Sequence, residues 1–481
     1  MNLSVVSRNI GIVLVFNAFF MLLSALVSAL YNFDSAFSPL LLSCFITLIA
    51  GMFPLVFVRK SDTLSAKEGY TIVIFSWLLS CIFGMLPYVL WGGEFSLINA
   101  WFESVSGYTT CGGTIVTDIE SLPHGLLFWR SSTHFLGGLG VIVFVLLILP
   151  TVSGFRQRLS KVEISVLSKE NYKFRTRQTI SVMASVYLGL TIAETVALML
   201  AGMNLFDAVN HAFSTISTGG FSTRNASIMA YDSVLIETII IFFMTVSGLH
   251  FGLIYMLVVS RSLKIFKSPV TRYYLMLVFG LALLMTIDTR VSNVLPTWGD
   301  AFRCCIFQAV SVASSTGFAT ADTSVWPAVS IILLMFLTIH AACSGSTSGG
   351  VKADRFFIFF KSVKAQLKKS VHPNAVIPVR VGNQIVEPEI VSAVNLFIAF
   401  YIMLLVISSV ILLAIGMPFM EAISSVIASM SNTGPGFGSV GSLGNFAMIP
   451  VVGKFILTFL MLLGRLEIFP VLVIFVIYKW R

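Results

Sequence analysis

The chain has 481 residues, of which 57% are hydrophobic and 11% are charged, and its mean hydropathy is +0.94. A soluble domain has about 45–50% apolar and about 25% charged residues, so these values exclude an ordinary soluble protein. The formal net charge of +9 does not indicate nucleic-acid binding, because positively charged cytoplasmic loops account for it in a membrane protein. Composition therefore predicts a polytopic membrane protein whose surroundings are the lipid bilayer.

Apolar stretches long enough to cross a bilayer recur along the whole chain. A spanning helix needs about 20 mostly apolar residues. The first stretch is too long for a secretory signal peptide, whose apolar core has about 7–15 residues, and a second stretch follows it directly. We expect about ten spanning helices, at residues 9–31, 38–58, 70–92, 131–151, 179–203, 234–260, 273–289, 326–350, 391–415 and 450–478.

Lysine and arginine residues predict the orientation, because short cytoplasmic loops are enriched in them. Most of the 30 basic residues fall on one side of the membrane if the N-terminus is cytoplasmic, and the C-terminus then lies on the same side. Two interpretations of the basic loops stay open: they reflect topology alone, or they form a docking surface for a cytoplasmic partner. The loops concerned are 156–177, 261–272 and 352–380.

Four short segments between long apolar stretches end in the same way, with hydroxyl-bearing or small polar residues followed by glycine. They recur roughly every 100 residues, which is typical of an internal repeat. Glycine reaches the positive-φ conformations that let a turn expose its carbonyls, and rings of carbonyls can replace the water shell of a cation. The segments are Thr110-Cys111-Gly112, Ser217-Thr218-Gly219, Ser315-Thr316-Gly317 and Asn432-Thr433-Gly434.

A half-length apolar segment precedes each glycine segment and is too short to cross a bilayer. Each begins near Asp, Asn or Glu, which satisfy free N–H groups and the positive end of a helix dipole. We therefore expect pore helices whose negative C-terminal ends point toward the membrane centre. They are Leu97–Tyr108, Phe206–Ile216, Ala301–Ala313 and Phe419–Met430.

These patterns predict an all-α polytopic membrane protein built around one central ion pore. An N-terminal two-helix hairpin at residues 1–68 carries no glycine segment. Four pseudo-symmetric units of helix, pore loop and helix follow, because non-helical backbone at membrane depth is tolerated where it lines water or is packed in protein. Their expected boundaries are 69–165, 166–265, 266–385 and 386–481.

The segments FESVSGYTTCGGT, FSTISTGGFST, FQAVSVASSTGFATAD and MSNTGPGFG resemble the four pore loops of the Trk/Ktr/HKT superfamily of potassium transporters. The N-terminal hairpin and the closing stretch from Gly464 to Pro470 favour its TrkH branch. The resemblance implies uptake of K⁺ through a selectivity filter with one glycine per loop, in the bacterial cytoplasmic membrane. It also implies a homodimer with a cytoplasmic nucleotide-binding regulatory ring of the TrkA type. Cys111 departs from the threonine common at its position.

A second candidate site lies where the apolar stretch from residue 326 is interrupted. A helix does not run well through three glycines and several serines or threonines. The interruption is interpreted either as a plain cytoplasmic loop or as a mobile loop beneath the filter; the resemblance favours the second, because the family carries an intramembrane gating loop here. The residues concerned are Gly345, Ser346, Thr347, Ser348, Gly349 and Gly350.

Arg465 is the charged residue most relevant to that loop. A charge inside a span costs about 2.5–3.5 kcal/mol on insertion scales and usually faces a cavity or a partner. Arg465 has two possible partners: Glu467, although residues i and i+2 do not face each other on a helix, or the carbonyls of residues 345–350. In the resembling family an arginine at this place adds an electrostatic barrier below the filter.

The sequence gives no sign of an enzyme. Its six cysteines show no CxxC spacing and its six histidines show no metal-ligand spacing. We therefore expect no catalytic residues and no bound organic cofactor. Within the transporter class, a sodium- or proton-coupled potassium symporter of the same fold is the alternative to uptake driven by the potassium gradient alone.

Overall fold

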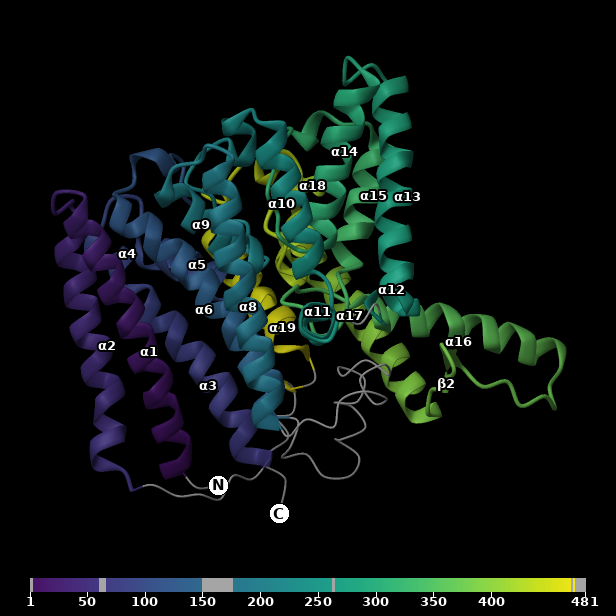
Figure 1. The fold of residues 1–481 in the computed structure, drawn as a ribbon, viewed down its shortest axis with the longest axis horizontal. Helices are drawn as coiled ribbons and strands as arrows, with labels where there is room; N and C mark the ends of the chain where they lie inside the picture. The colour runs from purple at the N-terminus through teal and green to yellow at the C-terminus, as the bar shows by residue number, and fades with distance from the viewer. Residues whose placement is uncertain (1–2, 60–65, 149–175, 262–263, 469, 472–481) are drawn as a thin grey trace.

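The computed structural model describes residues 3–59, 66–148, 176–261, 264–468 and 470–471, and these are mostly helical (Figure 1). Six helices are long and apolar enough to cross a membrane, and one bent helix pair would make a seventh. Large apolar side chains point outward from them. The described residues therefore confirm a multi-pass membrane protein, since such surfaces are stable against lipid and not against water.

The N-terminal hairpin consists of α1 (Leu3–Leu30) and α2 (Phe37–Phe57). The two helices cross closely at a pair of glycines. A β-carbon added to Gly11 would lie 2.6 Å from the Gly51 carbonyl oxygen, and one added to Gly51 would lie 2.9 Å from the Gly11 carbonyl oxygen. Small residues allow this approach between membrane helices, so the pair explains why the two helices pack tightly.

The rest of the chain repeats one order of elements: long helix, short helix, loop, short 3₁₀ turn, helix. The 3₁₀ turns are Ile119–Ser121, Ser227–Tyr231, Thr323–Val325 and Gly438–Val440. The helices are α3 (Ala66–Gly84), α4 (Leu86–Trp91), α5 (Leu97–Tyr108), α6 (His124–Ile148), α8 (Thr176–Leu200), α9 (Leu205–Ile216), α10 (Val234–Ser247), α11 (Phe251–Val259), α12 (Lys264–Lys267), α13 (Pro269–Val291), α14 (Trp298–Ala313), α15 (Ala328–Ile339), α16 (Ala353–Val371), α17 (Pro388–Ala414), α18 (Phe419–Ser431) and α19 (Val451–Leu466).

Three of the predicted spans differ from the helices in the structure. The prediction of one helix over residues 234–260 is wrong, because α10 and α11 meet at an angle of 107°. The span predicted for residues 326–350 ends as a helix at Ile339, four residues before Cys343. The span predicted for residues 450–478 is helical as α19 up to Leu466, and much of its remainder lies outside the described residues.

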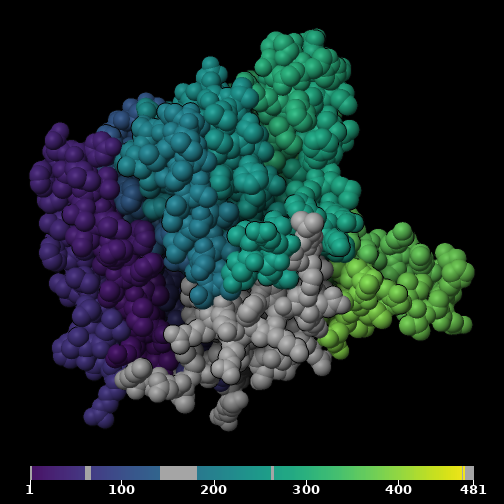
Figure 2. Space-filling model, viewed as in Figure 1, coloured from purple at the N-terminus to yellow at the C-terminus, as the bar shows by residue number. Residues whose placement is uncertain are grey.

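A small β-hairpin in the described part of the chain was also not predicted from the sequence. Strand β1 (Arg380–Val381) pairs antiparallel with β2 (Gln384–Ile385) across a turn in which Gly382 has φ +59°. The hairpin follows α16, which projects from the side of the molecule in Figure 1 and stands out from the surface in Figure 2. This end of the protein therefore presents a charged helix away from the helical body.

Candidate functional site

Four short helices, α5, α9, α14 and α18, position the predicted pore loops. In three of them the residue before the helix is a cap: its side-chain oxygen accepts a hydrogen bond from the backbone N–H three residues later. This bond satisfies one of the free donors at the helix start. The caps are Ser96 with Asn99, Asn204 with Asp207 and Thr297 with Asp300. The sequence prediction noted an Asp, Asn or Glu near each helix start and did not identify the caps, although a Ser, Thr or Asn at this place is a signal for the start of a helix.

All four helices end in the same backbone conformation. A non-glycine residue with left-handed backbone follows each helix. It is the second residue after α5, α9 and α14, where φ is +51° at Thr110, +58° at Thr218 and +58° at Ser315. It is the first residue after α18, where φ is +52° at Asn432. Two residues further on, a glycine again has positive φ. These glycines are Gly112 (+84°), Gly220 (+86°), Gly317 (+82°) and Gly434 (+92°).

The second loop corrects the predicted register by one residue. The prediction that Gly219 takes the positive-φ position is wrong, because Gly220 takes it and Gly219 does not. Ser217 ends α9 as its C-cap, as Ser314 does for α14. The equivalent triplets are therefore Thr110-Cys111-Gly112, Thr218-Gly219-Gly220, Ser315-Thr316-Gly317 and Asn432-Thr433-Gly434, and we call these four together the loop ring.

The loop ring is closed by contacts between neighbouring loops. Each positive-φ glycine packs so tightly on a carbonyl of the next loop that no β-carbon would fit, and the fourth loop returns to the first. All four glycines also line one cavity, which lies over the ring. A β-carbon added to Gly112 would lie 2.1 Å from the carbonyl oxygen of Gly219, and one added to Gly220 would lie 2.1 Å from that of Thr316. One added to Gly317 would lie 2.0 Å from the carbonyl oxygen of Thr433, and one added to Gly434 would lie 2.6 Å from that of Cys111.

The loop between α15 and α16 packs against the helix ends that carry the ring. The hydroxyl of Thr347 donates to the carbonyl of Ile216, the last residue of α9, at 2.9 Å. The N–H of Gly349 donates to the hydroxyl of Ser315 at 2.8 Å. A β-carbon at Gly349 would lie 2.3 Å from the carbonyl oxygen of Ser431. The loop therefore contacts the second, third and fourth units at once.

The same loop is bonded to the break between α10 and α11. The N–H of Cys343 donates to the carbonyl of Gly248 at 3.0 Å, and the N–H of Phe251 donates to the carbonyl of Gly345 at 3.1 Å. Backbone groups freed by one interrupted helix thus find partners in the other, which is the way that buried non-helical backbone is satisfied in membrane proteins. The two interruptions form one structural unit.

Arg465 joins this loop to the first unit. Its guanidinium is buried and donates to the carbonyl of Thr347 at 2.6 Å and to the carbonyl of Gly137 at 3.4 Å. The interpretation that Arg465 contacts the carbonyls of the loop is confirmed. The alternative pairing with Glu467 is wrong, because that carboxylate accepts from Arg355 at 2.5 Å.

The sequence prediction missed a buried ion pair beside the ring. Glu103 lies on α5 and Arg130 lies on α6, and their side chains meet at 2.8 Å with exposures of 0% and 1%. No short motif links two residues at this spacing, although a charged residue in each of two apolar segments was a signal that they could pair. By contrast, no group of three or more His, Cys, Asp or Glu residues that could hold a metal ion occurs in the described part of the chain.

The helical bundle and its closed ring of loops define a membrane transport protein. The family model TrkH, described as "Cation transport protein", matches residues 38–479. The chain is 35% identical to the Trk system potassium uptake protein TrkH of Escherichia coli (strain K12) and 34% identical to that of Halomonas elongata, over 100% of each chain.

A solved structure agrees with these matches. The crystal structure of the potassium transporter TrkH from Vibrio parahaemolyticus superposes with a TM-score of 0.91 at 32% identity, over 100% of both chains. The protein therefore belongs to the TrkH family of cation transport proteins. These relatives are transporters, which confirms the expectation that the chain is not an enzyme.

Proposed function

We propose that the protein takes up K⁺ across the bacterial cytoplasmic membrane, with the loop ring as a carbonyl-lined selectivity filter. The observation that carries the proposal is the closed ring, in which each loop presents a carbonyl to the positive-φ glycine of its neighbour. Carbonyl rings replace the hydration shell of a cation. The relatives are potassium uptake proteins, which supports the choice of ion.

The loop at Gly345–Gly350 is proposed as the gate, with Arg465 as its electrostatic part. Its contacts with three of the four loop-bearing units favour this role, because a shift of the loop would change the packing of the helix ends that carry the ring. We also propose that four units, at 69–165, 166–265, 266–385 and 386–481, follow the N-terminal hairpin. The protein is further proposed to form a homodimer and to have both termini on the cytoplasmic side.

Ion flux into liposomes that contain the purified chain tests the function. We expect K⁺ and Rb⁺ to pass faster than Na⁺ and Li⁺, at a rate that follows the electrochemical gradient of the ion itself. Equal rates for all four ions would reject the filter, and an absence of flux for every ion, both without and with a regulatory subunit, would reject the transport proposal.

A cytoplasmic nucleotide-binding ring of the TrkA type is the proposed regulator, and α16 is its proposed docking site. Lys361 donates to the carbonyl of Arg380 at 2.8 Å and is part of the local structure. Lys364, Lys368 and Lys369 are exposed on the projecting helix. Reversing these three charges to Glu is expected to weaken binding of the ring and to leave ion preference unchanged, since the helix lies outside the loop ring.

Surface charge pairs contribute about 0–1 kcal/mol each, so the triple variant is expected to lose at most ~3 kcal/mol, about a hundredfold in affinity. Pull-down of the regulator at low and moderate salt measures this loss. Unchanged binding at both salt concentrations would assign the lysines to membrane topology alone.

One observation favours the symporter alternative. Glu194 lies on α8 with 0% exposure, and neither carboxylate oxygen has a hydrogen-bond partner among the described residues. The hydroxyl of Thr215 on α9 donates to the carbonyl of His211 at 2.8 Å. Ionisable residues at membrane depth commonly mark proton or ion pathways.

Glu194→Gln separates the two functions. If K⁺ follows its own gradient, as we propose, a pH gradient will not drive uptake into liposomes and the variant will match the wild type. Uptake that is driven by the pH gradient in the wild type, and loses that dependence in Glu194→Gln, would establish proton-coupled symport and replace the gradient-only function.

A further inference from the structure

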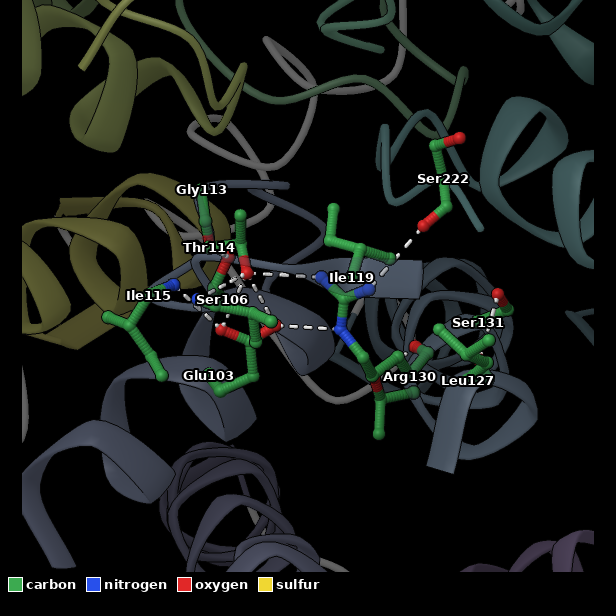
Figure 3. Close-up of polar contacts among 12 residues, drawn as sticks. Glu103, Ser106, Gly113, Thr114, Ile115, Ile119, Leu127, Arg130, Ser131 and Ser222 are labelled. Carbon is green, nitrogen blue, oxygen red and sulfur yellow. Dashed lines mark hydrogen bonds and ion pairs between the residues drawn. The ribbon is translucent and has the colours of Figure 1, made fainter. Parts of the chain in front are cut away.

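The buried pair of Glu103 and Arg130 lies behind the first loop of the ring. Figure 3 shows the guanidinium of Arg130 between the carboxylate of Glu103 on one side and Ser222 on the other. The carboxylate and the guanidinium meet at 2.8 Å. Buried pairs of this kind are rarely a net gain in stability over apolar side chains, because desolvation offsets their attraction. A role in positioning is therefore worth testing.

Glu103 holds the segment that follows the first glycine of the ring. Its carboxylate accepts from the hydroxyl of Thr114 at 3.0 Å and from the N–H of Ile115 at 3.0 Å. One turn later on the same helix, Ser106 donates to the carbonyl of Gly113 at 2.5 Å. The exit of the first loop is thus fixed at three consecutive residues, and hydrogen bonds to an ionised carboxylate are about twice as strong as neutral ones.

Arg130 joins this first loop to the second. Its guanidinium donates to the hydroxyl of Thr114 at 3.1 Å and to the carbonyl of Ser222 at 3.4 Å. It also lies 4.1 Å from the ring centre of Phe221, which directly follows Gly220. The planar fork of arginine can make these contacts together, whereas a lysine ammonium cannot. Arg130 therefore spans the boundary between two neighbouring loops.

The other three loops carry no such pair at the matching position. The residue seven places before the left-handed residue is Glu103 in the first loop and, in the others, His211, Gln308 and Ser425. His211 contacts the hydroxyl of Ser222 at 3.0 Å, and Gln308 donates to the carbonyl of Ala321 at 3.3 Å. The position supports the loop exit in three of the units, and the first unit alone uses a carboxylate there.

Arg130 also has an electrostatic effect on any cation that reaches the ring. It lines the cavity over the four glycines, where an uncompensated positive charge would repel cations. This repulsion is stronger inside the protein than in water, because the effective dielectric constant is lower there. Glu103 places a compensating negative charge 2.8 Å from the guanidinium.

We propose that Glu103 and Arg130 are positioning residues for ion selection: the pair clamps the exits of the first and second loops, and Glu103 neutralises Arg130 beside the cation path. The proposal rests on the loop ring acting as the filter. It predicts two separate effects. The geometry of the clamp sets the preference among ions, and the charge balance of the pair sets the rate of cation passage.

Three variants in liposomes separate geometry from charge, with K⁺, Rb⁺, Na⁺ and Li⁺ compared. Glu103→Gln should lower K⁺ flux and the K⁺/Na⁺ ratio several-fold, and the loss of flux should shrink when an impermeant salt is added, because salt screens an uncompensated charge. Arg130→Lys keeps the charge but loses the fork, so its main effect should be on the K⁺/Na⁺ ratio. Replacing both residues with Gln should restore flux relative to Glu103→Gln without restoring the ratio.

Glu237→Gln is the matched control. Glu237 faces Arg303 at 3.5 Å, and neither residue lines the cavity, so this variant should keep the flux and the ion ratio of the wild type. If Glu103→Gln does not fold, Arg130→Lys and the double variant still test the clamp. Wild-type flux and ratio in every folded variant would overturn it. Absence of ion preference in the wild type would instead reject the filter on which the clamp rests.

Discussion

Alanine at Gly112, Gly220, Gly317 or Gly434 is expected to abolish cation flux or to relax the preference for K⁺ over Na⁺. The added methyl group would lie 2.0–2.6 Å from a carbonyl oxygen of the next loop, so that carbonyl must move. A positive φ costs a residue with a β-carbon about 1–2 kcal/mol. Because about 1.4 kcal/mol is a tenfold change in preference, strain of this size is enough to erase selectivity while it leaves most of the folding free energy intact.

The four alanine variants are measured by flux in liposomes, with thermal unfolding as the check on folding. Gly280→Ala is the matched control, since a β-carbon at that glycine of α13 would meet no atom within 4 Å, and alanine is the better helix former. Four well-folded ring variants that keep the wild-type order of ion rates would remove the loop ring from the selection of ions.

The sequence predicted the four short helices to within three residues at each end, because their boundaries depend on local chemistry. The prediction Leu97–Tyr108 coincides with α5, and Phe206–Ile216 differs from α9 by one residue. The sequence did not predict the register of the second loop. Gly219 and Gly220 are adjacent, and either can take positive φ as far as the sequence shows; the choice is made by tertiary packing, since Gly219 faces the ring of His134 and Gly220 faces Thr316 of the next loop.

The bend between α10 and α11 could not be predicted for a different reason. The break holds Gly248, His250 and Gly252 inside an otherwise apolar stretch, but glycines inside a span are tolerated in membrane helices, so these residues alone do not predict a bend. The partner of the break is the backbone of a loop far along the chain: the N–H of Phe251 donates to the carbonyl of Gly345 at 3.1 Å. The serine- and glycine-rich loop itself was predicted, because its composition disfavours helix whatever the surroundings.

Replacing Arg465 with Ala is expected to raise the flux of cations that occurs without a regulator. Arg465 donates to the carbonyls of Thr347 and Gly137, so its loss frees the proposed gating loop. It also removes a buried positive charge below the ring. If that charge acts over about 8 Å with ~2 kcal/mol, the rate of passage should rise by more than about tenfold. Partial deletion within Gly345–Gly350 should act in the same direction, because it removes the steric part of the barrier.

Basal flux in liposomes without any partner protein measures the effect, and two variants identify its origin. Arg465→Lys keeps the charge and loses the paired hydrogen bonds, so an increase there would come from the freed loop. Lys454→Gln is the control on the same helix: Lys454 is also buried, but it donates to Asn99 and Ala447 near the start of α19, and its loss should leave basal flux unchanged. Unaltered basal flux and unaltered regulation in both the alanine and the deletion variants would show that this loop does not restrict the passage of ions.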